Sequence, residues 1–411
     1  MNIVHKSIAA LLLMTAVSSP ALAQTTVKYM TFSAAPNYIE ELDATIAAFQ
    51  ASHPDIKVEY ETQAFGEYFT KLQTLVAAGQ APDAFELNYE SFVDYANKGV
   101  LADLNPLIAA DAGFSTSVYN STALAAFSQN GKQFGLVESF SNVVLFYNQD
   151  LFDKAGVAYP TAEWTWKEEL DAAQKLTDAA NGVWGDFAPI QFWEFYKTIA
   201  QNGGAMFNAD KTEVTLDSPQ NVDTLQWMVD KVNKYHVTPT DAETAGLSSE
   251  DLFRQGKLAM LRTGIWLLGD FVDNAKFNWD IQLEPGNTNK AHHFFSNGVA
   301  VSATSGNQQA AYEWIKFLTS SKEAVDIRVK AGWELPAVSD QAAVQGYLDL
   351  PKPEHREVVF QALDTAVTPP VIANWNQLTD IVGKELEAAK LGQKTPQQAL
   401  ADAAAAVKGI L

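Results

Sequence analysis

Strand-like and helix-like patterns alternate near the N-terminus, and this alternation constrains the fold more than any other feature of the sequence. Short apolar or alternating runs predict strands over Thr26–Phe32, Ile56–Tyr60 and Ala84–Leu87. Apolar residues three or four positions apart predict two intervening helices, the first capped by Asn37 with Glu40 and the second ending at Gly79. Such alternation predicts a mostly parallel sheet, with ligands at the carboxyl ends of its strands.

The rest of the chain continues in this style. Thr165 with Glu168 has the spacing of a capping box, and Ser218 followed by Pro219 is a typical helix start. Leu258–Leu261 has the composition of a buried strand. The C-terminal third is predicted to be mainly helical, over residues 308–319, 322–330, 354–366, 377–389 and 396–407. At about 150 residues per domain, 411 residues predict two or three domains. Because no linker is evident, we expect the backbone to pass between lobes more than once.

The first residues have the pattern of a secretory signal peptide. Lys6 supplies a positive charge, residues 8–17 are apolar, and Ala21 to Ala23 form an A-x-A cleavage site. The apolar run is shorter than the roughly 20 residues of a membrane helix. Because no lipidation cysteine accompanies the site, we expect cleavage after Ala23 and a mature protein free in the periplasm.

Charge and composition exclude several classes of function. Lys and Arg total 28 against 49 Asp and Glu, a formal charge of −21, whereas nucleic-acid binding requires a basic face. The absence of cysteine rules out disulfide scaffolds, thiolate metal sites and cysteine nucleophiles. Ten tryptophans are the first indication of the ligand chemistry.

No recognised catalytic motif occurs: there is no phosphate-binding P-loop, dinucleotide fingerprint, G-x-S-x-G elbow or H-E-x-x-H. His292 and His293 are the only adjacent histidines, and neighbouring strand residues point to opposite faces, which makes them a poor metal clamp. We therefore expect neither a metal nor a cofactor. A glycoside hydrolase would need two carboxylates roughly 5–10 Å apart, and none of the acidic residues stands out by position.

Several ordered motifs resemble one family across nearly the whole mature chain. The segments that carry the resemblance are Ala48-Phe49 with His53-Pro54 and Ile56–Val58, Ala77–Asp83, Gly131–Leu136, Phe146–Phe152, Trp164–Glu168, and Phe253–Met260 with Gly264–Trp266. Each segment is weakly specific, but their order and spacing are similar to those of the maltose-binding-protein-like extracellular solute-binding proteins of ABC importers. The chain departs from the family pattern at Val137-Glu138, where a proline is common.

The resemblance implies a two-lobed periplasmic-binding-protein fold of class α/β, in which each lobe is a mostly parallel sheet flanked by helices. It implies a first lobe over residues 24–137 and 298–332 and a second over 141–296 and 335–411. Hinge segments are expected near residues 136–141, 295–299 and 333–337. The implied function is capture of a carbohydrate between the lobes by a monomer that delivers it to the membrane permease subunits, without turnover.

Sugars offer hydroxyl groups and flat C–H patches, which carboxylates, amides and aromatic faces bind. Asn88, Tyr89 and Glu90 follow the third predicted strand at its carboxyl end, where ligands bind in open α/β sheets. By resemblance, further ligand contacts are expected at the crossings and in the second lobe: Glu138, Ser141, Asn142, Trp193, Glu194, Trp266, Trp333, Glu334 and Trp375.

Two alternatives remain open from the sequence. An anionic ligand, such as glycerol phosphate or an acidic sugar, would favour an arginine in the site, and Arg262 beside Gly264 and Trp266 is the candidate. The second alternative is a periplasmic glycoside hydrolase. The sequence therefore predicts the class of protein and leaves the identity of the sugar open.

Overall fold

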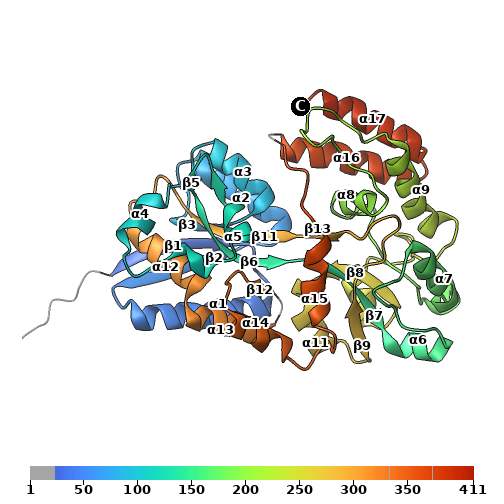
Figure 1. The fold of residues 1–411 in the computed structure, drawn as a ribbon, viewed down its shortest axis with the longest axis horizontal. Coiled ribbons are helices and arrows are strands. Elements are labelled where there is room, and N and C mark those ends of the chain that lie inside the picture. Colours follow the sequence, from blue (N-terminus) through green and yellow to red (C-terminus); the bar gives the residue numbers. More distant parts are fainter. Residues whose placement is uncertain (1–23, 333, 373) are drawn as a thin grey trace, which may run out of the picture.

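The computed structural model describes residues 24–332, 334–372 and 374–411, so the predicted signal peptide and Trp333 lie outside the described residues. The described chain forms two lobes that lie side by side (Figure 1). The first lobe is built on a six-stranded sheet with strand order β12-β6-β11-β3-β1-β2. These strands are β1 (Thr25–Thr31), β2 (Ile56–Thr62), β3 (Ala84–Asn88), β6 (Gly135–Ser141), β11 (Phe295–Val301) and β12 (Leu335–Pro336).

Helices pack around this sheet, and the largest buried side chains lie between them and the strands. Trp314 is fully buried and contacts the rings of Tyr29 and Phe49 edge-on at 5.6 and 5.3 Å. Helix α14 packs against α13 at the lower edge of the lobe (Figure 1). The remaining elements of this part are α1 (Pro36–Ser52), α2 (Phe65–Ala77), α3 (Tyr89–Asn97), α4 (Asn105–Ala110), η1 (Thr116–Val118), α5 (Ser121–Ala125), β4 (Ser128–Gln129), β5 (Lys132–Gln133), α12 (Gln308–Ser320), α13 (Lys322–Ala331) and α14 (Gln341–Leu348).

The second lobe contains a three-stranded sheet of order β8-β7-β9, formed by β7 (Val143–Asn148), β8 (Met260–Gly264) and β9 (Trp279–Gln282). A short parallel pair, β10 (His292–His293) and β13 (Ala366–Val367), lies beside it. Its helices are α6 (Gln149–Ala155), α7 (Trp166–Leu176), η2 (Ala179–Asn181), α8 (Phe192–Gln201), α9 (Pro219–Asn233), α10 (Ser249–Arg254), η3 (Ile265–Leu267), α11 (Leu268–Asn274), α15 (Glu357–Gln361), η4 (Ala362–Thr365), α16 (Trp375–Lys390) and α17 (Pro396–Lys408).

The two-lobed α/β class is confirmed, but a mostly parallel sheet in each lobe is not. In the first lobe β1 runs parallel to β2 and β3, as expected from the alternation of strands and helices. In the second lobe β7 pairs antiparallel with both β8 and β9, so that part of the prediction is wrong. The reason is topological: β8 and β9 lie more than a hundred residues after β7 in the sequence, so they do not form consecutive β-α-β units with it, and the rule for such units does not apply.

Local predictions agree with the structure where side chains form the expected caps. The Thr165 capping box is present, with the Glu168 carboxylate accepting from the Thr165 backbone N–H at 3.0 Å. The box predicted at Asn37 is absent, because α1 begins at Pro36 with Ala35 as its cap residue, so Asn37 lies inside the first turn. The strand predicted over Leu258–Leu261 is observed at Met260–Gly264.

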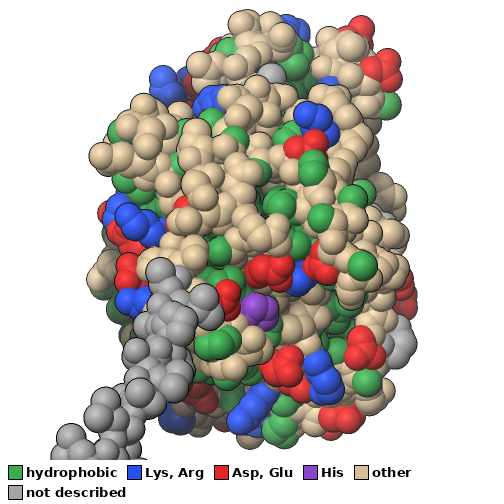
Figure 2. Space-filling model, turned by 90° about the vertical axis from the view of Figure 1, so that its left-hand side faces the viewer, with side chains coloured by type: hydrophobic (Ala, Val, Ile, Leu, Met, Phe, Trp, Pro, Cys, Tyr) green, Lys and Arg blue, Asp and Glu red, His purple; other side chains and the backbone are tan. Residues whose placement is uncertain are grey.

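Three strand segments connect the lobes. Strand β11 pairs antiparallel with β3 and β6, and β6 also pairs with β12, so these strands lie together in the centre of the molecule (Figure 1). The chain passes into the second lobe after β6, returns at β11, and leaves the first sheet again at β12. The three expected hinge segments overlap these strands. The space-filling view of the end of the first lobe shows acidic and basic side chains interspersed, so no single-sign patch gathers there (Figure 2).

Candidate functional site

The carboxyl end of β3 supplies the first group of predicted site residues. Asn88 caps α3 by accepting from the Ser91 N–H at 3.3 Å, so its side chain shapes the strand-to-helix turn. Glu90, in the first turn of α3, is 1% exposed. Burial raises the pKa of Glu90 to about 7, and its Oε1 has no hydrogen-bond partner within the described part of the chain. Its chemistry suits a ligand hydroxyl.

Helix α3 faces the second lobe. Tyr89 and Val93 pack against an apolar cluster built mainly from α8, α9, α16 and α17. Within that cluster Trp375 is 6% exposed and contacts Phe192 edge-on at 5.3 Å. Burial raises the pKa of Tyr196, and the charge of Glu90 adds to the effect, which places this carboxyl close to α8. Tyr89 and Glu90 of the first lobe and Trp375 of the second are therefore brought together at the boundary.

Aromatic rings continue along this boundary. We name Trp193, Tyr196, Trp266, Phe295 and Trp375 the boundary aromatic cluster. Trp193 contacts both Phe295 and Trp375 at 5.7 Å and Tyr196 at 6.4 Å, and Trp266 contacts Phe295 at 5.9 Å. Rings of this kind cover the C–H faces of a sugar.

The position of Trp266 in the cluster depends on close packing of its indole against Gly264. Its six-membered ring lies so close to Gly264 that a Cβ at that position would overlap it. Only glycine therefore leaves room for the observed position of the indole. The Tyr38 hydroxyl of α1 donates to the Trp266 carbonyl at 2.6 Å, which ties the first lobe to this segment of the second.

Glu194 and Arg262 lie in the interior of the second lobe, within a buried network of ion pairs. Glu194 is 2.6 Å from Lys197 and 3.7 Å from His293, while Arg262 pairs with Glu169 and approaches Glu194 at 3.8 Å. Burial opposes ionisation of Glu194, but the charge of Lys197 and its other partners lowers its pKa below the ordinary value. The Arg262 side chain has no exposed surface. Both charged groups are thus directed at partners inside the lobe.

The predicted residues at the crossings surround a second buried arginine. Arg328 of α13 lies 2.6 Å from Glu138, 3.4 Å from Glu41 and 3.6 Å from Glu334. Burial raises the pKa of Glu334 to about 8, although Arg328 opposes the shift. This arrangement ties α1, α13 and two crossing segments together.

Ser141 and Asn142 are the remaining predicted ligand residues at the crossings. Ser141 is 2% exposed, and the Asn142 amide donates to the Val359 carbonyl at 2.7 Å, which fixes the first crossing to α15. The Oδ1 of Asn142 lacks a partner among the described residues.

Two members of the boundary aromatic cluster, Tyr196 and Phe295, are missing from the predicted site. A sequence signal existed for each. Tyr196 follows Trp193 by three residues, which places both on one helix face. Phe295 follows His293 by two, which places both on one side of an extended segment. His292 and His293 themselves are buried.

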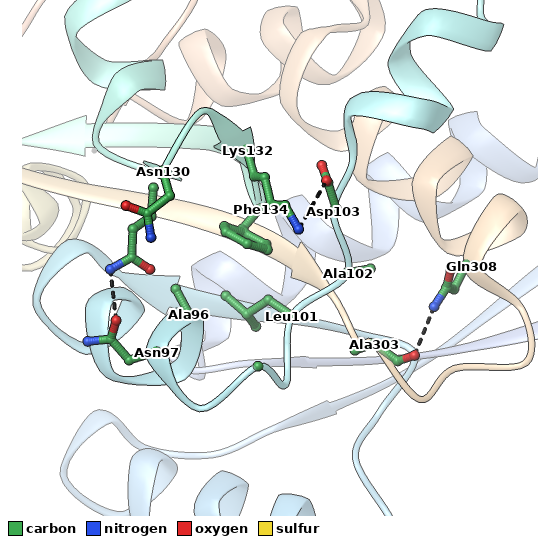
Figure 3. A pocket seen from close by; sticks show the side chains of 12 residues that line it. Ala96, Asn97, Leu101, Ala102, Asp103, Asn130, Lys132, Phe134, Ala303 and Gln308 are labelled. Atoms are coloured by element: carbon green, nitrogen blue, oxygen red, sulfur yellow. Dashed lines mark hydrogen bonds and ion pairs between the residues drawn. The ribbon is translucent and has the colours of Figure 1, made fainter.

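Two hollows in the described part of the chain lie away from this boundary. One, of about 590 Å³, is on the first lobe, where Gln129 pairs with Asn97 and Lys132 with Asp103 (Figure 3). The other, of about 380 Å³, lies on the second lobe beside Trp227. Neither is lined by a predicted site residue. Among the described residues, no group of three or more His, Cys, Asp or Glu could hold a metal ion, and no helix there is long and apolar enough to cross a bilayer.

Comparison with known proteins agrees with the two-lobed fold described above. Residues 35–325 match the family described as bacterial extracellular solute-binding protein. In structure, the chain is similar to an ABC substrate-binding protein from Listeria monocytogenes in complex with cycloalternan. The two share 49% identity with a TM-score of 0.91 over 94% of this chain and 99% of that one.

Two curated relatives are more distant. An arabinooligosaccharide-binding protein of Bacillus subtilis is 29% identical over 56% of this chain and 53% of its own length. A periplasmic sn-glycerol-3-phosphate-binding protein of Escherichia coli is 26% identical over 97% of this chain and 95% of its own length. From the family match, the fold and the grouping of residues at the lobe boundary, this chain belongs to the bacterial extracellular solute-binding proteins.

Proposed function

We propose that this protein is the substrate-binding component of an ABC importer, and that it captures a carbohydrate between its lobes without chemical turnover. The observation that carries the proposal is the boundary aromatic cluster together with the buried carboxyl of Glu90, whose charge acts on Tyr196 of that cluster. Aromatic faces bind the C–H patches of a sugar, while Glu90 offers an oxygen to a hydroxyl. The similarity to the Listeria protein in complex with cycloalternan supports the same ligand class.

An anionic ligand is the competing proposal, because the Escherichia coli relative is named for sn-glycerol 3-phosphate. Phosphate recognition favours an arginine fork that is open to the ligand. Arg262 is fully buried and pairs with Glu169, while Arg328 lies among Glu138, Glu41 and Glu334. These arrangements favour a neutral sugar.

The lobes are proposed to move about the three crossings. We assign residues 24–137 and 298–332 to one lobe and 141–296 and 335–411 to the other, with β6, β11 and β12 as the connecting strands. Within the last segment, α14 follows β12 directly and packs against α13 of the first lobe. Ligand contacts from both lobes favour the closed state, and the closed state would be the form that the permease subunits recognise. Export with cleavage after Ala23, and free diffusion as a monomer in the periplasm, are part of the same proposal.

A binding screen tests the ligand class. The mature chain is heated with cycloalternan, acarbose, maltotriose, mannotriose, sn-glycerol 3-phosphate and a set of amino acids, and its melting temperature is recorded. At a hundredfold excess over Kd a true ligand adds about 2.7 kcal/mol to the free energy of unfolding. We expect a saccharide to stabilise the protein and to be recovered chemically unchanged. Stabilisation by sn-glycerol 3-phosphate or an amino acid alone would contradict the proposal.

A further inference from the structure

Phe295 has a position that none of the predicted ligand residues shares. Its ring contacts Trp193 at 5.7 Å with an interplanar angle of 68°, and Trp266 at 5.9 Å with an angle of 59°. Trp193 comes from α8 and Trp266 from the segment after β8, so Phe295 is the ring through which two separate elements meet. All three side chains are partly exposed, which leaves aromatic surface for a ligand.

One face of the Phe295 ring packs against His293. The imidazole of His293 stacks on it at 5.0 Å with an angle of 16°. A hydrogen bond of 2.8 Å joins His293 Nδ1 to the Tyr196 hydroxyl, and Glu194 lies 3.7 Å from Nε2. His293 is buried and connects Phe295 to the ion pairs inside the second lobe. This support fixes the orientation of the phenyl ring before a ligand arrives, which reduces the entropy cost of binding.

The neighbouring phenylalanine provides an internal comparison. Phe294 is also partly exposed, but it stacks on Phe140 of β6 at 6.0 Å and contacts neither tryptophan. Successive side chains of an extended segment point to opposite sides, so Phe294 and Phe295 lie in different surroundings one residue apart.

We infer that Phe295 is a carbohydrate-contacting residue: it presents aromatic surface between the Trp193 and Trp266 contacts and binds the C–H face of a sugar ring. The inference rests on the proposed function. Since Phe295 begins β11, a sugar on this ring also touches one of the strands that connect the lobes.

The test compares Phe295→Ala with Phe294→Ala by calorimetric titration against cycloalternan, acarbose, maltotriose and mannotriose. For the saccharide that the wild type binds, we expect Phe295→Ala to raise Kd at least tenfold, Phe295→Tyr to raise it less, and Phe294→Ala to stay within threefold of the wild type. The melting temperature without sugar is measured for each variant. If Phe295→Ala does not fold, Phe295→Leu replaces it, because it keeps most of the volume and removes the ring.

The outcomes distinguish the role of Phe295 from carbohydrate binding by the whole protein. A folded Phe295→Ala or Phe295→Leu protein that keeps its affinity, or an equal loss in Phe294→Ala, would overturn the role of Phe295 while leaving carbohydrate binding intact. A wild-type protein that binds sn-glycerol 3-phosphate or an amino acid and no saccharide would overturn the proposed function, and this inference with it.

Discussion

At the scale of single residues, Trp266 connects the fold most directly to the proposed chemistry. Its indole is partly exposed, lies over Gly264 and contacts Phe295 at 5.9 Å. We expect Trp266→Ala to weaken saccharide binding by about 2–4 kcal/mol, the range of a buried aromatic hot spot, and Trp266→Phe to weaken it less. Calorimetric titration and a ligand-free melting curve on the same variants check this.

Trp375 is the matched comparison for Trp266. It is 6% exposed and packs in the apolar cluster beside Phe192, so its removal leaves a cavity. Trp375→Ala is expected to cost about 3–5 kcal/mol of ligand-free stability, whereas Trp266→Ala costs much less. A large loss of ligand-free stability in Trp266→Ala, with affinity nearly intact, would show that Trp266 is a core residue.

Glu90 provides a prediction about pH. Burial raises its pKa from 4.5 to about 7. Because the folded state then holds the proton more tightly than the unfolded state, stability from this group is present below about pH 4.5 and is lost as the pH rises towards 7. Glu90→Gln removes this loss, so urea unfolding should show a variant about 2–3 kcal/mol more stable than the wild type at pH 8 and nearly equal to it at pH 4.5.

The exposed Glu67 is the control for this measurement, since Glu67→Gln should change stability by less than about 0.5 kcal/mol at either pH. A difference between Glu90→Gln and the wild type that is the same at both pH values would be inconsistent with a buried, proton-holding carboxyl.

The location of these residues was only partly predictable. Asn88, Tyr89 and Glu90 could be placed because the carboxyl end of a parallel strand is a known ligand position. The partners of Arg262 could not, because they come from residues 169 and 194, and sequence alone does not show which carboxylates meet a given arginine. The place of Phe295 in the site was not predictable, because it depends on contacts with two tryptophans that are distant in the sequence.

At the scale of elements, Arg328 joins helix α13 to the crossings. Its guanidinium is 5% exposed and lies among Glu138, Glu41 and Glu334. Removing one partner of a buried ion pair leaves uncompensated charge, so Arg328→Met is expected to lower the free energy of unfolding by about 3–5 kcal/mol in urea at pH 8.

Arg254 offers the matched control on α10. It pairs with Asp251 and, at 2.7 Å, with Asp270, but it is 32% exposed. Solvent screens such a pair, so Arg254→Met should cost below about 1 kcal/mol. Equal losses in the two variants would show that the buried cluster contributes no more than a surface ion pair.

Helices with a long apolar face were predicted well, because their period is visible in the sequence: α12, α16 and α17 lie within two residues of the expected bounds at every end. The helix expected over residues 354–366 is instead α15 followed by η4, and α14 was missed. Helix α14 is only eight residues long, and it lies where tertiary packing against α13 decides the local structure. The antiparallel order of β7, β8 and β9 also depends on contacts between distant segments.

At the scale of the whole molecule, the lobes contact each other at separate places as well as sharing three crossings. Tyr38 of α1 donates to the Trp266 carbonyl at 2.6 Å, and Tyr89 of α3 packs against the cluster of α8 and α16. A ligand that touches both lobes can shift the balance between open and closed states by its differential affinity.

Small-angle X-ray scattering of the mature protein, with and without a saturating saccharide identified by the binding screen, tests most directly whether the two lobes close on a carbohydrate. Closure should give a smaller radius of gyration with the saccharide, and no change is expected with a sugar that does not bind. A scattering profile that stays the same at saturation would contradict it.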